Sequence, residues 1–348
     1  MELSDLIFKT VFVFVIFGVS LLIAMYSTYA ERKFAAFFQD RIGPNRAGPF
    51  GILQPLADGV KMFMKEEIIP SHADKALFIL GPSVAMLTAC MTGVVIPWGG
   101  TLLINGREFA MQITDVNIGI LYVFGVVSIG VYGIMIGGWA SNNKFSLLGA
   151  LRASSQMISY ELAMGMSIIA VVMMTGSLSV KEIVDGQPGM SWNVFYQPLG
   201  FLLFLICALA ETNRTPFDLP ECETELVGGY HTEYSSMKLG FYLFAEYINM
   251  FISSAVIVCL YFGGYNFPFV EGLPLSHNFI TILGSGIFFL KIFFFIFLFM
   301  WIRWTIPRFR YDQLMRLGWI VLLPLAVLNI IITAMVLLWK HNLWSVNF

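Results

Sequence analysis

Residues 279–302 read FITILGSGIFFLKIFFFIFLFMWI, a long apolar stretch whose one charged residue is Lys291. A helix needs about 20 consecutive, mostly apolar residues to cross the hydrocarbon core of a bilayer. Stretches of this kind recur along the chain, which is 58% hydrophobic and only 12% charged. The sequence therefore predicts an all-α polytopic membrane protein that forms a single integral membrane domain over residues 1–348.

Eight transmembrane helices can be placed on this pattern. The predicted spans are Leu6–Thr28, Ala76–Trp98, Val116–Gly138, Gln156–Thr175, Met190–Ala210, Leu239–Gly263, Phe279–Ile302 and Leu317–Trp339. Pro198 and Pro324 lie inside two of these spans. Because proline removes an intrahelical hydrogen bond, each should kink or break its helix.

Residues 51–69, GILQPLADGVKMFMKEEII, are too short and too charged to span a bilayer. Apolar residues recur there at helical spacing on one side, and polar residues fall on another. The apolar set is Ile52, Leu56, Val60 and Phe63, and the polar set is Gln54, Asp58, Lys61 and Lys65. This pattern predicts an amphipathic helix that lies in the inner membrane interface.

When successive connections between spans are assigned to opposite sides of the membrane, most of the cations fall on one side. One side carries Arg32, Lys33, Arg41, Arg46, Lys61, Lys65, Lys75, Lys144, Arg152, Arg214, Lys238, Arg303, Arg308, Arg310 and Arg316. The other carries Arg107, Lys181 and Lys340, with Lys9 near its edge. Because Lys and Arg favour the inner side, both termini are predicted to face outward.

The connection over residues 211–238 concentrates acid on the inner side. Its first part, ETNRTPFDLPECETELVGGYHTE (residues 211–233), sets one cation, Arg214, against six carboxylates: Glu211, Asp218, Glu221, Glu223, Glu225 and Glu233. Asp218 and Glu221 have the spacing of a capping box, and the helix it would start places Asp218, Glu221 and Glu225 on one face. Crowded carboxylates cannot all ionise freely, so the pattern favours proton handling over its alternative, a capped and solvated acidic helix.

Three further ionisable residues, Glu161, Glu246 and Lys291, fall inside predicted spans. A charge at the centre of a bilayer costs at least about 2.5 kcal/mol on insertion scales. The two glutamates have the alternative of reaching the interface, and Lys291 has the alternative of pairing with an acid for packing. Lys291 lies near the middle of its span, where these alternatives explain it least well. A functional role is therefore favoured for all three residues.

Several classes of protein lose support. The four cysteines show no CxxC spacing and the four histidines fall outside the spans, so iron–sulfur, zinc and haem sites, or any other metal site, are not predicted. No nucleotide motif or nucleic-acid partner is indicated, and the absence of an internal repeat disfavours an inverted-repeat transporter.

The inner basic residues have two interpretations. One is that they set topology and contact anionic lipid, and it applies to Arg32, Lys33, Arg41, Arg46, Arg303, Arg308 and Arg310. Alternatively, some of them line the mouth of a path for a hydrophobic ligand with a polar head, beside Phe37, Phe38 and Phe63. The residues predicted at that mouth are Arg41, Arg46, Asp58 and Lys61.

Two long segments, GILQPLADGVKMFMKE (Gly51–Glu66) and PFDLPECETELVGG (Pro216–Gly229), resemble the signature segments of one family, the H subunits of respiratory complex I. This is the membrane subunit that forms most of the quinone chamber in the proton-pumping NADH:quinone oxidoreductase. The segments AERKFAAFFQDRIGPNRAGP, SSQMISYELA and PRFRYDQLM are also similar to its loops. Cys222 departs from the family pattern, in which a smaller Gly or Ala is expected.

The resemblance implies a subunit that is active only within its complex, in a bacterial inner membrane in preference to a mitochondrial one. Quinone would be the substrate, no cofactor would be bound covalently, and iron–sulfur clusters and FMN would lie in partner subunits. Partners would be the peripheral-arm subunits, the antiporter-like and small membrane subunits, and lipid.

The resemblance also implies roles for individual residues. Arg41, Asp58 and Lys61 would lie where quinone enters. Glu161 and Glu246 would continue a buried acidic path, and Arg303, Arg308 and Arg310 would contact the peripheral arm. The chamber wall would carry Glu211, Arg214, Asp218, Glu221, Glu223, Glu225 and Glu233.

The preferred hypothesis is therefore a subunit that couples quinone reduction to proton translocation. One alternative is the membrane anchor of an energy-converting hydrogenase, with similar acids and no quinone. Others are a stand-alone cation–proton antiporter that uses Glu246, Lys291 and the acidic loop, and a pure scaffold.

Overall fold

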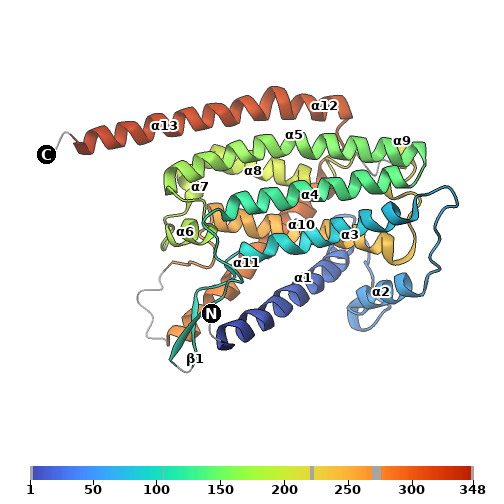
Figure 1. Ribbon diagram of the computed structural model, residues 1–348, viewed down its shortest axis with the longest axis horizontal. Helices are drawn as coiled ribbons and strands as arrows, with labels where there is room; N and C mark the ends of the chain where they lie inside the picture. The colour runs from blue at the N-terminus through green and yellow to red at the C-terminus, as the bar shows by residue number, and fades with distance from the viewer. Residues whose placement is uncertain (1–2, 105, 220–222, 269–275, 346–348) are drawn as a thin grey trace.

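The computed structural model describes residues 3–104, 106–219, 223–268 and 276–345 (Figure 1). Within these residues, seven helices are long and apolar enough to cross a membrane. Six of them are α1 (Leu3–Phe38), α3 (Lys75–Thr92), α4 (Gly119–Ala140), α5 (Lys144–Thr175), α10 (Ser236–Tyr261) and α11 (His277–Thr305). The seventh runs from α12 (Tyr311–Arg316) into α13 (Leu323–Ser345). The helical membrane architecture predicted from hydropathy is confirmed.

The predicted span over Met190–Ala210 is broken at Pro198, as predicted, and neither part is long enough to count among the seven spanning helices of the described residues. The segment forms a short helix, α7 (Asn193–Tyr196), and a separate helix, α8 (Pro198–Glu211), with Gln197 between them. Pro198 starts α8, where its missing N–H leaves no helical hydrogen bond unmade. With 14 residues, α8 is about 21 Å long at about 1.5 Å per residue, less than the hydrocarbon core. It still runs alongside α5 (Figure 1).

The last span is distorted near its proline, as predicted. A π-helical stretch, Leu317–Leu322, precedes α13, and Pro324 is the second residue of that helix. The wider turn accommodates the missing donor without a loop. At the outer edge of the bundle α13 packs along α5 (Figure 1).

The predicted interfacial helix is present but shorter than residues 51–69. A 3-10 turn (Pro49–Gly51) leads into α2 (Gln54–Met64), and Lys65 is already extended. The following residues bind the start of α10 instead of continuing the helix: the N–H of Ile68 donates to Ser235 Oγ at 3.0 Å, and Glu67 pairs with Lys238. The predicted apolar side of α2 is exposed, and the helix packs on α1 and α10.

One end of the bundle carries a hairpin that hydropathy had placed only as a loop. Strands β1 (Thr101–Ile104) and β2 (Arg107–Ala110) pair antiparallel, with Thr101 opposite Ala110. The hairpin, α6 (Val180–Asp185), α7, the start of α1 and the end of α13 lie at this end (Figure 1). At the opposite end lie α2 and the four-residue helix α9 (Glu223–Leu226) (Figure 1).

The most buried of the spanning helices is α10, which contacts α1, α2, α3, α8 and α11. Its side chains, including Phe251 and Tyr261, form much of the core, and Phe251 stacks on Trp98. A polar residue on α10 therefore faces several other helices, and not lipid. This position decides the environment of Glu246.

A buried polar cluster fastens α13 to the start of α8. Gln197 Nε2 donates to Thr333 Oγ1 at 2.6 Å, and Asn329 Nδ2 donates to Gln197 Oε1 at 3.0 Å. All three side chains are buried. Because the rest of α13 presents mainly apolar, exposed side chains, this cluster fixes the register of the helix.

Replacing Asn329 by Leu should lower the free energy of unfolding by about 1–3 kcal/mol, because Gln197 Oε1 loses its donor in an apolar setting. The measurement is thermal unfolding of the detergent-purified protein by circular dichroism. Leu328→Val, on the exposed side of the same helix, is the matched control. The double variant Asn329→Leu with Gln197→Leu should recover part of the loss, and an unchanged single variant would contradict the role of the cluster.

Candidate functional site

A buried cation joins two helices of the bundle. Arg214 follows α8, and its guanidinium lies 3.1 Å from Glu246 Oε2 on α10 and 3.7 Å from Glu31 Oε2 on α1. The same guanidinium lies over the ring of Tyr247, 4.2 Å from its centroid. Because a buried charge is costly unless it is paired, these contacts stabilise the position of the chain that follows α8.

Glu31 is the second centre of this cluster. It pairs with Arg303 at the end of α11, and Tyr247 Oη donates to its Oε2 at 2.9 Å. Its side chain is buried, and it lies within α1, which continues to Phe38. One signal was present in the sequence: Glu31 is an acid directly before Arg32 and Lys33, where topology favours cations.

Glu246 is held from a second direction by Tyr230, whose hydroxyl donates to Glu246 Oε1 at 2.8 Å. Tyr230 sits in the 3-10 turn Gly229–His231, at the end of the acidic loop. We call Glu31, Arg214, Glu246 and Arg303 the charged cluster. Its two acids and two cations balance, so it is neutral when all four are ionised.

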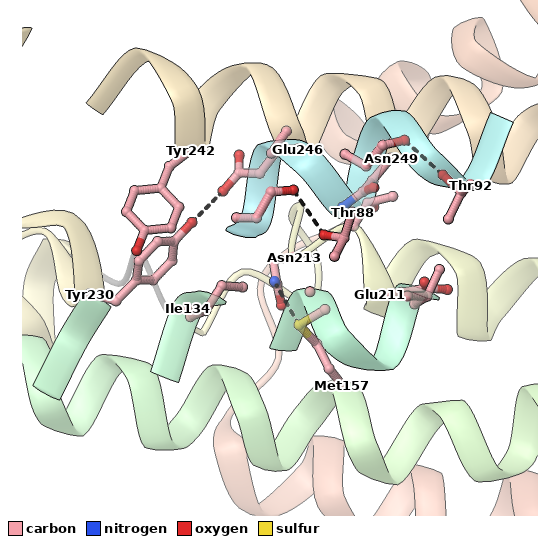
Figure 2. A pocket seen from close by; sticks show the side chains of 16 residues that line it. Thr88, Thr92, Ile134, Met157, Glu211, Asn213, Tyr230, Tyr242, Glu246 and Asn249 are labelled. Atoms are coloured by element: carbon pink, nitrogen blue, oxygen red, sulfur yellow. Dashed lines mark hydrogen bonds between the residues drawn. The ribbon is translucent and has the colours of Figure 1, made fainter. Parts of the chain in front are cut away.

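A small polar cavity adjoins the charged cluster, between α3, α4, α5, α8 and α10 (Figure 2). Glu211 and Glu246 both line it, together with Thr88, Thr92 and Asn249. Its volume of about 30 Å³ admits water and excludes any organic ligand. The cavity thus brings together two carboxylates that the sequence placed on one path.

The third carboxylate of that path, Glu161 on α5, contacts the hydroxyl of Ser128 on α4. It does not line the polar cavity, but it is close enough to Glu211 to interact with it electrostatically. Helices α5 and α8 pack against each other, which places the two acids on neighbouring helices. Ser128 was not singled out from the sequence, because an isolated serine in an apolar span carries no signal.

The predicted acidic helix that starts at Asp218 includes residues 220–222, which lie outside the described residues, so this prediction stays untested. Asp218 is buried and non-helical, and its carboxylate accepts a hydrogen bond from Arg308 Nη2 at 2.8 Å. The described part of the helix that follows is α9 (Glu223–Leu226). Arg308, which holds the Asp218 carboxylate, is distant in sequence. Glu221, Cys222 and the side chain of Glu223 lie outside the described residues.

The other described acids of this loop are paired separately. Glu225 is exposed and its Oε2 lies 2.6 Å from Arg152 Nη1. Glu233 Oε1 accepts from Asn143 Nδ2 at 2.6 Å, and Asn143 also caps the start of α5. The described carboxylates are therefore dispersed among separate partners, and the predicted crowding on one face is not found among them.

A second, larger pocket of about 120 Å³ opens between α1, α2 and α10. Asp58 lies on its rim, with Oδ2 2.7 Å from Arg32 Nη1 and Oδ1 3.4 Å from Lys61 Nζ. Its walls are mostly apolar and include Met25, Leu243 and Phe244. Tyr247 also lines this pocket, which we call the interfacial pocket. One tyrosine therefore separates the interfacial pocket from the charged cluster.

Opposing influences act on Asp58. Burial raises its pKa, but the charges of Arg32 and Lys61 and hydrogen bonds from Gln54 and Lys61 act in the other direction, and the net pKa lies below its ordinary value. Asp58 is therefore ionised at neutral pH, and the two cations stay gathered around it.

Three residues that were predicted at the mouth lie apart from the interfacial pocket. Arg41 is exposed and its Nε donates to Gln39 Oε1 at 2.7 Å, and Arg46 is exposed. Phe63 is exposed on the apolar side of α2. Asp58 and Lys61 are the predicted mouth residues that do line the pocket.

The basic residues predicted to contact a partner hold acids of this chain. Arg303 pairs with Glu31 and Arg308 with Asp218, whereas Arg310 is exposed beside Asp312. Both inward pairs leave part of the arginine exposed, at 21% and 34% of the side chain. They connect the surface of the protein with the buried acids.

Lys291 lies in a different part of the molecule. Its Nζ donates to the carbonyls of Phe262, Gly264 and Asn266 at 2.8, 2.9 and 2.8 Å. These carbonyls follow the end of α10, so the ammonium closes that helix terminus. No acid accepts from it among the described residues. In the described chain, no group of three or more His, Cys, Asp or Glu is placed to hold a metal ion.

Comparison with known proteins gives the family. The family model described as NADH dehydrogenase matches residues 10–334. The chain is 72% identical to the H 1 subunit of NADH-quinone oxidoreductase from Cytophaga hutchinsonii over 325 residues, which are 93% of this chain and 95% of that protein. It is 62% identical to the H subunit from Flavobacterium johnsoniae over 345 residues, 99% of this chain and 98% of that protein. The chain belongs to the family of H subunits of NADH-quinone oxidoreductase, which are membrane subunits of the enzyme complex I.

Proposed function

We propose that this chain forms a wall of the quinone-binding chamber of complex I and couples quinone reduction to proton translocation. The observation that carries the proposal is the contact chain from the interfacial pocket through Tyr247 to Arg214 and on to Glu246. A hydrophobic ligand with a polar head fits the apolar walls and charged rim of that pocket.

Access of quinone is proposed between α1, α2 and α10. There the tail would lie against Met25, Leu243 and Phe244, and the head would pass Arg32, Asp58 and Lys61. The pocket is too small for a whole long-chain quinone, so the chamber is completed by partner subunits. We infer that these are the peripheral-arm subunits, which would also carry the iron–sulfur clusters and FMN.

Coupling would begin when quinone reduction adds negative charge beside the charged cluster. That charge would compete with Glu31 and Glu246 for Arg214. A buried carboxylate that loses its cation takes up a proton, because its charged form is then unsolvated. Glu246 would thus be the first carboxylate of this chain to change its protonation.

From Glu246 the proposed route runs through the polar cavity to Glu211 and then to Glu161. It would continue toward the antiporter-like and small membrane subunits of the complex. In the proposed orientation the α2 and α9 end faces the cytoplasm of a bacterium and both termini face outward, since the cations gather at that end. The names of the relatives favour this function over a hydrogenase anchor or a stand-alone antiporter.

Glu246→Gln tests the coupling role. The variant keeps the side-chain shape but removes the charge that pairs with Arg214 and a proton-binding site. We expect assembled complex with a proton-to-electron ratio at least about twofold lower, measured as acidification per NADH oxidised in proteoliposomes. Glu225→Gln, in the exposed pair with Arg152, is the control and should pump normally. Full pumping by Glu246→Gln would contradict the proposal.

Asp58→Asn tests the interfacial pocket. Without the carboxylate, Arg32 and Lys61 repel each other and leave the rim, so the KM for a short-chain quinone should rise by about two- to fivefold, as expected for a largely exposed ion pair. A depressed pKa means the ion pair is present above the usual carboxyl range and is lost only as pH falls through that lowered pKa.

The ratio of mutant to wild-type KM should therefore stay constant between about pH 6 and about pH 8. The measurement is steady-state NADH:quinone oxidoreduction at several pH values, with Asp312→Asn on the exposed inner surface as control. An unchanged KM in Asp58→Asn would remove this pocket from the quinone path.

A further inference from the structure

Two half-buried side chains that line the polar cavity, the carboxylate of Glu211 and the amide of Asn249, make no hydrogen bond to another side chain or backbone group among the described residues. Figure 2 shows Asn249 and Glu246 on α10, with Glu211 on a different helix that lines the same cavity. A polar group enclosed without a hydrogen bond costs about 1–3 kcal/mol. In native proteins such groups bind ordered water where the cavity is polar and large enough.

The other donors that line this cavity are already engaged. The hydroxyls of Thr88 and Thr92 donate to carbonyls of their own helix, at 3.0 Å to Ala85 and at 2.7 Å to Ala89. The remaining lining donors also have acceptors: Tyr230 on Glu246, Tyr242 on Gly133, Thr212 on Leu209 and Asn213 on Met157. The Asn249 Nδ2 group is therefore the uncommitted donor of the described lining.

Acceptors, by contrast, are abundant. The carboxylate of Glu211 and the lone pairs of Thr88 and Thr92 all line the cavity. A bound water needs two to four polar partners. When a donor on the cavity wall binds the water oxygen, the two hydrogens of the water point at acceptors. Asn249 supplies this donor, and it lies one helical turn from Glu246 on α10.

We propose that Asn249 is a positioning residue that holds an ordered water between Glu246 and Glu211, and that this water relays the proton. The inference rests on the proposed function and names the element that bridges its two carboxylates. In the relay, the acid O–H bond of Glu246 breaks and its proton joins the water oxygen. A different O–H bond of the same water breaks, and that proton joins the carboxylate of Glu211. The water is regenerated, and Asn249 donates throughout without changing its protonation.

The test uses Asn249→Leu, which is close to isosteric and removes the donor, and Asn249→Ser, which restores a donor and leaves space for water. In proteoliposomes that contain the whole complex, we expect the pumping rate of Asn249→Leu to fall by about fivefold, the factor for one lost hydrogen bond. Asn249→Ser should pump at close to the wild-type rate. Asn249→Val carries the same expectation as Asn249→Leu if the latter does not assemble.

The redox-induced infrared difference spectrum distinguishes the proposed relay from a merely structural role of Asn249. The carboxyl band that Glu211→Gln removes should shift to higher frequency in Asn249→Leu and return in Asn249→Ser. If Asn249→Leu pumps normally while Glu211→Gln does not, the relay is overturned and the proposed function stands. If Asn249→Leu, Glu211→Gln and Glu246→Gln all pump normally, both are overturned.

Discussion

The position of Arg214 between Glu31 and Glu246 is the constraint on which the rest of the site depends. The three side chains come from a loop, α1 and α10, and each is buried. Removing one partner would leave a charge without compensation in a low-dielectric interior, a change that costs several kcal/mol. The path of the chain after α8 and the approach of α1 to α10 are therefore set by one guanidinium.

Tyr247 connects this cluster to the interfacial pocket. The Arg214 guanidinium lies over its ring, its hydroxyl donates to Glu31, and the same side chain lines the interfacial pocket. A change of charge or shape in that pocket therefore reaches the charged cluster through one residue and needs no long-range rearrangement. The adjoining cavity lies on the other side of Glu246, so this carboxylate belongs to both the electrostatic part and the proton-conducting part of the proposed path.

The spans could be predicted from the sequence because apolar length is a local property, and Glu161 and Glu246 stood out because charge in a bilayer is costly. Pro198 indicated a break in the fifth span, but the buried polar cluster of Gln197 with Asn329 and Thr333 could not be predicted, because hydropathy does not register pairings between helices. The pairing of Asp218 with Arg308 was not predicted, because the two residues are distant in sequence. Glu31 was overlooked because the flanking cations gave it an ordinary explanation. Pairings between residues on different helices cannot be read from a single sequence.

The two kinds of charge in this chain behave differently. Arginine does not release its proton at any physiological pH, so Arg214 and Arg303 can respond to new negative charge only by changing partners. Glutamate responds by binding a proton. A neutral cluster of both kinds therefore converts an electrostatic change at the interfacial pocket into a protonation change at Glu246. Lys291, satisfied by three carbonyls at the far end of α10, lacks this conversion, because no described carboxylate competes for it. The location of the acids relative to arginine, and not their number, defines the proposed path.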